Sequence, residues 1–254
     1  MVSLTQRDHS LITNLSEFGV LSTSQIWALN FKNTRKTTLL RRLRILERNN
    51  KIRRIHGLSD GSHGWSLTLS CAREFGVRGV FKNINRNSIH HDITLSQVRL
   101  SLKSVGLGDN WVPEHILRYR AWEARERIRK IPESIPDGIF TLHKNNEHLV
   151  VSVELEMNLK NSSRYGKIFA AYYFKRNLGM LWYLVPNVSF GRRLEQIWHK
   201  NYKENSRLYW SLISQVLQAP YDIELHKNGK KILLRDLVTI TNPAHNSAQG
   251  VSSF

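Results

Sequence analysis

Acidic side chains occur at selected points of two predicted strands in the second half of the chain. Asp137 begins one strand, and Glu154 and Glu156 lie two residues apart on the next, so both point to the same face of a sheet. That strand is otherwise apolar, and buried carboxylates are costly unless they are paired or bind metal. Lys160 and Lys167 follow closely. Carboxylates with lysines nearby can hold Mg²⁺ and orient water, so the pattern indicates metal-dependent cleavage of a phosphodiester.

The same carboxylates also have a structural interpretation. Glu154 and Glu156 could pair with Arg164, with Lys167 or with the basic segment 118–130, and would then fix the fold or an interface. Structural ion-pair networks imitate active sites in this way. The sequence leaves both roles open, and we favour the structural one.

A basic stretch near the N-terminus indicates a different chemistry. Residues 34–51 read TRKTTLLRRLRILERNNK, and at about 100° per residue the leucines fall on one side of a helix. These leucines are Leu39, Leu40, Leu43 and Leu46. Thr34 is the expected N-cap, and Asn49-Asn50 is the expected stop. Residues 35–54 hold nine Lys or Arg and one acid, Glu47. The helix therefore offers one face to a core and the other to an anion.

The polar face of this helix suits DNA. Threonines stand among arginines that have almost no acids to balance them, and this mixture fits the base edges and phosphates of a major groove. A solvated basic face is the simpler alternative, and we favour DNA recognition. The expected contacts from the helix are Thr34, Arg35, Lys36, Thr37, Thr38, Arg41, Arg44 and Arg48. Those from the hairpin that follows it are Arg53, Arg54, His56 and His63.

The elements around the basic helix predict a winged helix-turn-helix domain. Residues 1–18 are an expected helix ended by Gly19, and a second short helix covers SQIWALNF. After the basic helix, KIRRIHG and WSLTL alternate as strands around the glycine-rich loop GLSDGSHG. Three helices and a hairpin in this order are typical of the winged helix. We place this domain at residues 1–78 and a linker at residues 79–88.

The second half predicts an α/β domain at residues 89–241, followed by a flexible tail at residues 242–254, so the fold class is α+β. A helix at DITLSQVRLSLKSVGL comes first, then a strand at WVPEHILRYRAW that leads into a basic loop. The strands PDGIFTL and LVVSVELEM follow, then the helix SSRYGKIFAAYYFKRN and the strand MLWYLVPN. Helices are expected at RRLEQIWHKNY and RLYWSLISQVLQ, and a last hairpin at Asn228-Gly229.

Charge and composition favour a polyanion as partner. The net charge is +18, and residues 1–88 hold 15 Lys or Arg against 5 Asp or Glu, which places the main anion contact in the first third. No apolar run approaches the roughly 20 residues needed to span a bilayer, and the N-terminus lacks the apolar segment of a secretory signal. We therefore expect a cytoplasmic protein without a membrane partner. The single cysteine, Cys71, excludes an intrachain disulfide.

The order of elements in the second half, with Pro136-Asp137 and Glu154-x-Glu156, resembles the PD-(D/E)XK nuclease superfamily. Three motifs together resemble the replication-relaxation family of plasmid and mobile-element proteins. They are LTQRD at residues 4–8, RRLRIL in the basic helix, and PDG followed by VELEMNLKNSSRYGKIFAAYY. The resemblance covers residues 5–175.

This resemblance implies an N-terminal winged helix, a nuclease-like second domain, and a role in plasmid replication control or in DNA relaxation or mobilisation. Asp137 and Glu154 match the metal carboxylates of the superfamily. Glu156 stands where the usual pattern has a lysine, and Lys160 or Lys167 could supply that charge from the helix side. The departure leaves nuclease activity open, and we favour a degenerate domain.

Three functions follow from these observations. The favoured one is a sequence-specific double-stranded DNA-binding protein of a mobile element, either a transcriptional regulator or a replication or mobilisation accessory factor. It would act as a homodimer and need no cofactor to bind DNA. The second is a Mg²⁺-dependent endonuclease or nickase that uses the carboxylates and lysines above. The third is an adaptor that docks a relaxase or replication initiator through Trp182, Trp198 and Trp210, although tryptophan is more often buried.

Overall fold

The computed structural model describes residues 3–58, 62–80, 84, 88–108, 110–128, 134–144, 147–175, 177–202 and 207–238. The predicted tail at residues 242–254 lies outside this part of the chain. The fold is mixed α and β, as expected, and the chain divides into two compact units. The first unit comprises Met1–Gln97 and His115–Arg129, and the second comprises Val98–Glu114 and Lys130–Phe254. The chain therefore passes between the units inside a helix, and the expected linker at residues 79–88 belongs to the first unit.

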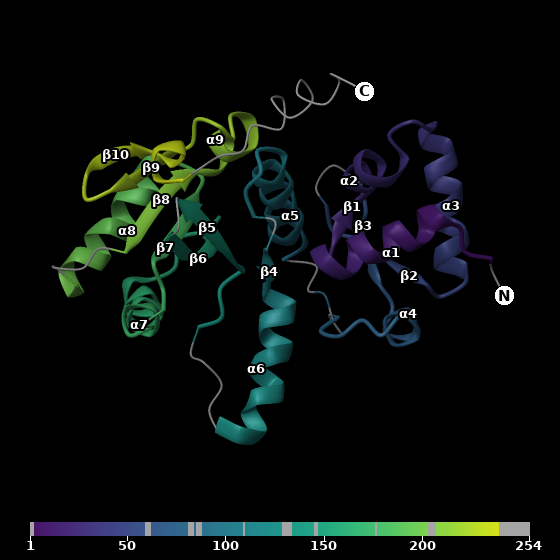
Figure 1. The fold of residues 1–254 in the computed structure, drawn as a ribbon, viewed down its shortest axis with the longest axis horizontal. Helices are drawn as coiled ribbons and strands as arrows, with labels where there is room; N and C mark the ends of the chain where they lie inside the picture. Colours follow the sequence, from purple (N-terminus) through teal and green to yellow (C-terminus); the bar gives the residue numbers. More distant parts are fainter. Residues whose placement is uncertain are drawn as a thin grey trace, which may run out of the picture. The chain divides into compact units, whose positions relative to one another are not determined.

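The first unit is mainly helical and contains a small antiparallel sheet with the strand order β1-β3-β2 (Figure 1). Its elements up to residue 74 are α1 (Gln6–Phe18), β1 (Leu21–Ser22), α2 (Thr23–Ile26), the π-helical turn η1 (Trp27–Phe31), α3 (Lys36–Arg48), β2 (Ile52–Ile55), β3 (Gly64–Leu67) and α4 (Leu69–Glu74). Strand β1 was not predicted, because two residues are too few to show a period.

Local signals in the sequence explain where α1 begins and ends. Thr5 and Asp8 form a reciprocal capping box at its N-terminus, which satisfies backbone N–H groups that have no partner within the helix. Gly19 ends the helix with a positive φ of 76°, a conformation that glycine adopts without strain. The apolar stripe of α1 then packs against α3 and β3 in a core that includes Leu11, Leu43 and Trp65.

Helix α3 forms where expected, with two corrections. Its N-cap is Arg35 and not Thr34, because the Thr34 hydroxyl donates to the carbonyl of Phe31 in the preceding turn at 2.8 Å. The predicted apolar stripe is also one leucine too wide: Leu39, Leu43 and Leu46 are buried, whereas Leu40 is 40 % exposed. The stop at Asn49-Asn50 is confirmed.

In the region after the first sheet, a predicted strand is mostly helix. Helix α5 (Ile89–Ser104) forms as expected, but only Val112–Pro113 of WVPEHILRYRAW is extended, as β4, and α6 runs over Glu114–Ile128. The alternation that suggested a strand is short, and the residues after Pro113 are mostly good helix formers. The backbone N–H of Glu114 donates to the carbonyl of Asp137 at the start of the helix, at 3.0 Å.

The second unit is built on a mixed seven-stranded sheet with the order β10-β9-β8-β7-β6-β5-β4. Strand β7 pairs in parallel with β6 and with β8, and the other pairs are antiparallel. The remaining elements are β5 (Gly138–Lys144), β6 (Glu147–Leu155), α7 (Ser162–Tyr173), β7 (Met180–Val185), α8 (Val188–Asn201), β8 (Leu208–Leu212), α9 (Ile213–Gln218), β9 (Glu224–Lys227), β10 (Lys230–Leu233) and α10 (Leu234–Leu237).

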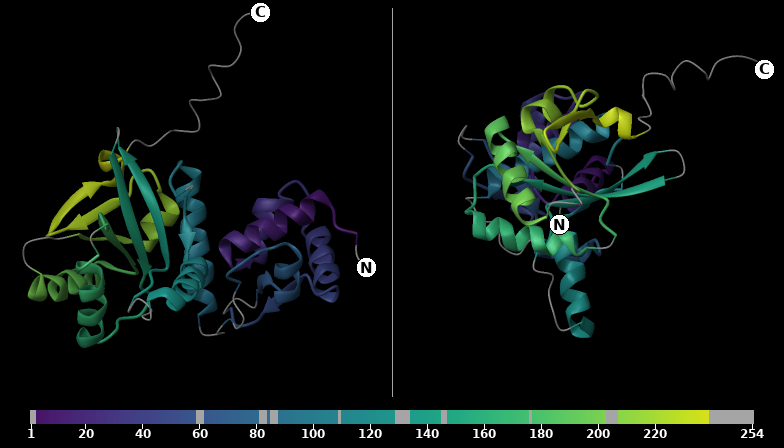
Figure 2. Two further views of the ribbon diagram at one scale, coloured as in Figure 1. Left: turned by 60° about the horizontal axis from the view of Figure 1, so that its bottom comes forward. Right: turned by 90° about the vertical axis from the view of Figure 1, so that its left-hand side faces the viewer.

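Helices α7 and α8 cover the same face of this sheet (Figures 1 and 2). The segment RLYWSLISQVLQ, expected as one helix, is instead β8 followed by α9, because its first half pairs between β7 and β9 inside the sheet. The predicted turn at Asn228-Gly229 is confirmed, with positive φ at both residues.

The tryptophans considered for docking belong to the core of the second unit. Trp182, Trp198 and Trp210 are buried, the first two completely. They do not form the surface on which the adaptor hypothesis relied. In the described residues, no helix combines the length and apolar character needed to cross a membrane.

Candidate nucleic-acid interface and acidic site

The outer face of α3 carries cations that the protein does not neutralise. Arg41, Arg44 and Arg48 are exposed, and none of them forms an ion pair or hydrogen bond with a described residue. Arg35, Lys36, Thr37 and Thr38 are also exposed at the start of the helix. Because the leucines on the other side are buried, the helix cannot rotate without exposing its core, and the orientation of these cations is fixed.

Arg42 differs from its neighbours on α3. Its Nε donates to Oδ1 of Asp8 at 2.8 Å, and its terminal NH2 group also contacts the same carboxylate. Burial would raise the pKa of Asp8, but the hydrogen bonds from Arg42 and Thr5 outweigh it and hold that pKa below its ordinary value. Arg42 therefore joins α3 to α1 and is not available to a ligand.

Fewer side chains of the β2–β3 hairpin are available to a ligand than the sequence suggested. Arg54 donates to Glu47 at 2.7 Å and lies over the ring of Trp65, so it is held by the protein itself. Burial lowers the pKa of the partly buried Arg53. The rings of His56 and His63 meet edge to face with centroids 4.8 Å apart, at the base of the loop whose residues 59–61 lie outside the described part. Of the four expected hairpin contacts, His56 is exposed and the half-buried His63 lies beside it.

The three predicted carboxylates do come together in the second unit, but each has a partner. Oδ2 of Asp137 accepts the backbone N–H of Leu155 at 2.7 Å. Glu154 accepts a hydrogen bond from the Tyr172 hydroxyl of α7, and Glu156 pairs with Lys160. Arg164 and Lys167, considered as partners from the sequence, are exposed on α7. Of the observed partners, Lys160 was expected to supply charge to this site, whereas Tyr172 was not singled out from the sequence.

The surroundings of Glu154 in this cluster raise the pKa of its carboxyl group. Burial, followed by the nearby charge of Asp137, raises the pKa of Glu154 well above its ordinary value, against the opposing effects of Tyr172 and Lys160. Burial, followed by the charge of Glu154, raises the pKa of the Tyr172 hydroxyl. The Tyr172 hydroxyl and the Glu154 carboxylate therefore form a hydrogen bond that joins α7 to β6.

This arrangement differs from an open Mg²⁺ site. A magnesium ion binds carboxylate oxygens that are open to it, and here a protein donor occupies one oxygen of each of the three groups. Among the described residues, no three His, Cys, Asp or Glu side chains form a set of metal ligands. Lys167 lies on the exposed side of α7, and Glu114 begins α6 instead of lying on a strand.

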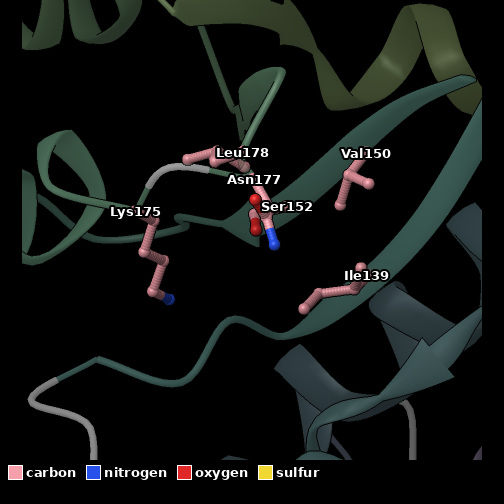
Figure 3. Close-up of a pocket in the computed structure, with 6 residues that line it drawn as sticks. All are labelled: Ile139, Val150, Ser152, Lys175, Asn177 and Leu178. Carbon is pink, nitrogen blue, oxygen red and sulfur yellow. The ribbon is translucent and has the colours of Figure 1, made fainter.

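A pocket of about 310 Å³ lies in the second unit, between β5, β6 and the segment after α7 (Figure 3). Its lining residues are Ile139, Val150, Ser152, Lys175, Asn177 and Leu178. None of these residues was singled out from the sequence. The one available signal was Ser152, a polar residue inside the apolar run LVVSVEL.

No family model, curated protein or solved structure matches this chain. The resemblance to the replication-relaxation family therefore remains a prediction from the sequence motifs.

Proposed function

We propose that the protein binds double-stranded DNA in a sequence-specific manner, as a transcriptional regulator or as a replication or mobilisation accessory factor of a mobile element. The observation that carries this proposal is the outer face of α3, where Arg41, Arg44 and Arg48 are exposed and unpaired among the described residues. An unneutralised row of guanidinium groups on a rigid helix suits phosphates and guanine edges.

The surrounding elements support a winged-helix interpretation of the first unit. Helix α3 follows the short turn after η1, and the β2–β3 hairpin comes directly after it. In such domains the third helix enters the major groove and the hairpin approaches the neighbouring backbone. His56 and His63 at the base of the hairpin loop would then face phosphate. We further propose that two copies bind paired half-sites, as helix-turn-helix proteins commonly do.

The test begins with selection of bound duplexes from a random pool, using the full chain. On the selected site we expect Arg41→Ala and Arg44→Ala to weaken binding by about 1–3 kcal/mol each. Lys230→Ala is the matched control, because it removes an exposed cation from the β9–β10 turn of the other unit. Parent-like binding by both arginine variants would show that α3 is not the recognition helix.

For the second unit we propose a nuclease-like domain whose acidic cluster holds the structure together. The support is that donors from the protein occupy Asp137, Glu154 and Glu156. Supercoiled plasmid with Mg²⁺ or Mn²⁺ tests this directly, with Glu154→Ala beside the parent. We expect no nicking by either protein. Nicking by the parent that Glu154→Ala abolishes would establish the endonuclease alternative instead.

A further inference from the structure

We propose that the pocket formed by Ile139, Val150, Ser152, Lys175, Asn177 and Leu178 binds a phosphate monoester that carries an apolar body. Figure 3 shows Lys175 on one side of the pocket, Ile139 and Val150 on the other, and Ser152 and Asn177 between them. All six residues belong to the second unit. The proposal does not depend on DNA binding by α3.

The polar groups of the pocket have hydrogen-bonding capacity that the protein does not use. Ser152 is only 2 % exposed, yet within the described residues its hydroxyl has no hydrogen-bond partner. The Asn177 side chain, at the mouth of the pocket, has none either. The Ser152 hydroxyl and the Asn177 amide therefore line the pocket as donors that a ligand oxygen can accept from.

Lys175 supplies the positive charge and is held in place. Its ammonium donates to the carbonyl of Ser134 at 3.3 Å and lies 4.3 Å from the centre of the Tyr172 ring. Arg207 donates to the Lys175 carbonyl at 2.8 Å, which fixes the backbone as well. Lys175 forms no ion pair with a described carboxylate, and burial lowers its pKa, so a ligand anion would relieve the cost of enclosing its charge.

The donors and the remaining walls indicate the ligand class. An ammonium, an amide and a hydroxyl from three positions can each donate to a different terminal oxygen of a phosphate monoester, whereas a carboxylate offers two oxygens. No carboxylate lines the pocket to repel it. The side chains of Ile139, Val150 and Leu178 offer an apolar wall, and a volume of about 310 Å³ is at the small end of ligand sites. A free mononucleotide and the phosphorylated end of a nucleic-acid strand both present this chemistry.

Calorimetric titration of the full chain tests the site. The probes are a nucleoside 5′-monophosphate, the same nucleoside without phosphate, and short single strands with and without a 5′-phosphate. We expect the monophosphate to bind at least tenfold more tightly than the nucleoside. Preference for the phosphorylated strand over the monophosphate would identify a strand end as the ligand, and the reverse would identify a free ester.

Variants test whether the residues of the pocket, and not other cations of the protein, bind the monophosphate. We expect Lys175→Gln to weaken binding of the monophosphate at least tenfold and Ser152→Ala to weaken it severalfold, whereas Lys167→Gln on the exposed face of α7 leaves it unchanged. Thermal unfolding checks that each variant is folded, and Asn177→Ala at the exposed mouth replaces any that is not. Arg41→Ala should retain full binding, which separates this site from α3. The proposal is overturned if no phosphate monoester binds, or if the pocket variants bind as the parent does.

Discussion

The outer face of α3 and the acidic cluster of the second unit handle charge in opposite ways. On α3, Arg41, Arg44 and Arg48 point to solvent without acidic partners among the described residues. In the acidic cluster, Asp137 and Glu156 are buried, Glu154 is half-buried, and each carboxylate has a donor, such as Tyr172 for Glu154. Charges left open at the surface contribute little to stability and are available to a ligand, whereas enclosed charges must be satisfied by the fold itself. We therefore propose that the outer face of α3 binds a ligand and that the acidic cluster stabilises the second unit.

The largest expected effect is a difference in folding stability between variants of two adjacent arginines, Arg42 and Arg41. Arg42→Ala should lower the free energy of unfolding by about 3 kcal/mol, because it leaves the buried Asp8 carboxylate without its charged partner and with only the hydrogen bonds from Thr5. Arg41→Ala should change it by less than about 0.5 kcal/mol, since its side chain is exposed. Urea unfolding measures both.

A double variant controls for lost packing in this comparison. Asp8→Ala combined with Arg42→Ala removes both charges and should cost less than the two single changes together. Equal destabilisation by Arg41→Ala and Arg42→Ala would remove the distinction between open and enclosed arginines on α3.

The next effect concerns the salt dependence of DNA binding. Arg48→Ala should lower the slope of log affinity against log salt concentration by about one unit if Arg48 contacts a phosphate. Arg54→Ala should change the slope less, because Arg54 is already paired with Glu47. Titrations of the selected duplex at several salt concentrations measure this. A larger change for Arg54 than for Arg48 would mean that the ion pair opens when DNA binds.

The smallest effects are two pH dependences of opposite sign. Asp8 has a lowered pKa, so the stability that it contributes is present above its ordinary value of 3.8 and is lost as the pH falls through the folded-state pKa. Glu154 has a raised pKa, so the folded state loses stability as the pH rises from the ordinary value of 4.5 toward the folded-state pKa.

Unfolding measured across pH separates these contributions. Asp8→Asn should flatten the acid side of the stability profile, and Glu154→Gln should reduce the loss of stability above pH 4.5. Parent-like profiles for both variants would show that neither carboxylate is coupled to folding as the contacts require.

Much of the fold follows from short-range patterns. The helix end at Gly19, the stop at Asn49-Asn50 and the turn at Asn228-Gly229 depend on neighbours within a few residues, and the structure confirms all three. The two errors have different causes. Residues 114–122 became helix because the residues after Pro113 are mostly good helix formers, which a short alternation concealed. Residues 208–212 became a strand because they pair with β7, and that pairing depends on a neighbouring element.

The features of the candidate sites likewise divide into those that the sequence identified and those that only the structure showed. The sequence identified the cationic face of α3 and the three carboxylates, because periodicity and strand alternation report which side chains share a face. It did not identify the bond from Tyr172 to Glu154 or the pocket of Lys175, since these join residues from separate elements.

By itself, the amino-acid sequence determined that the chain forms an amphipathic basic helix, a β-rich second half and a strong positive charge, because these depend on composition and on local spacing. Only the tertiary structure decided which arginine pairs with Asp8 and which arginines stay open, because that pairing depends on how α1 lies against α3. Residues that are distant in sequence become partners through packing, and no local pattern in the sequence specifies which residues those are.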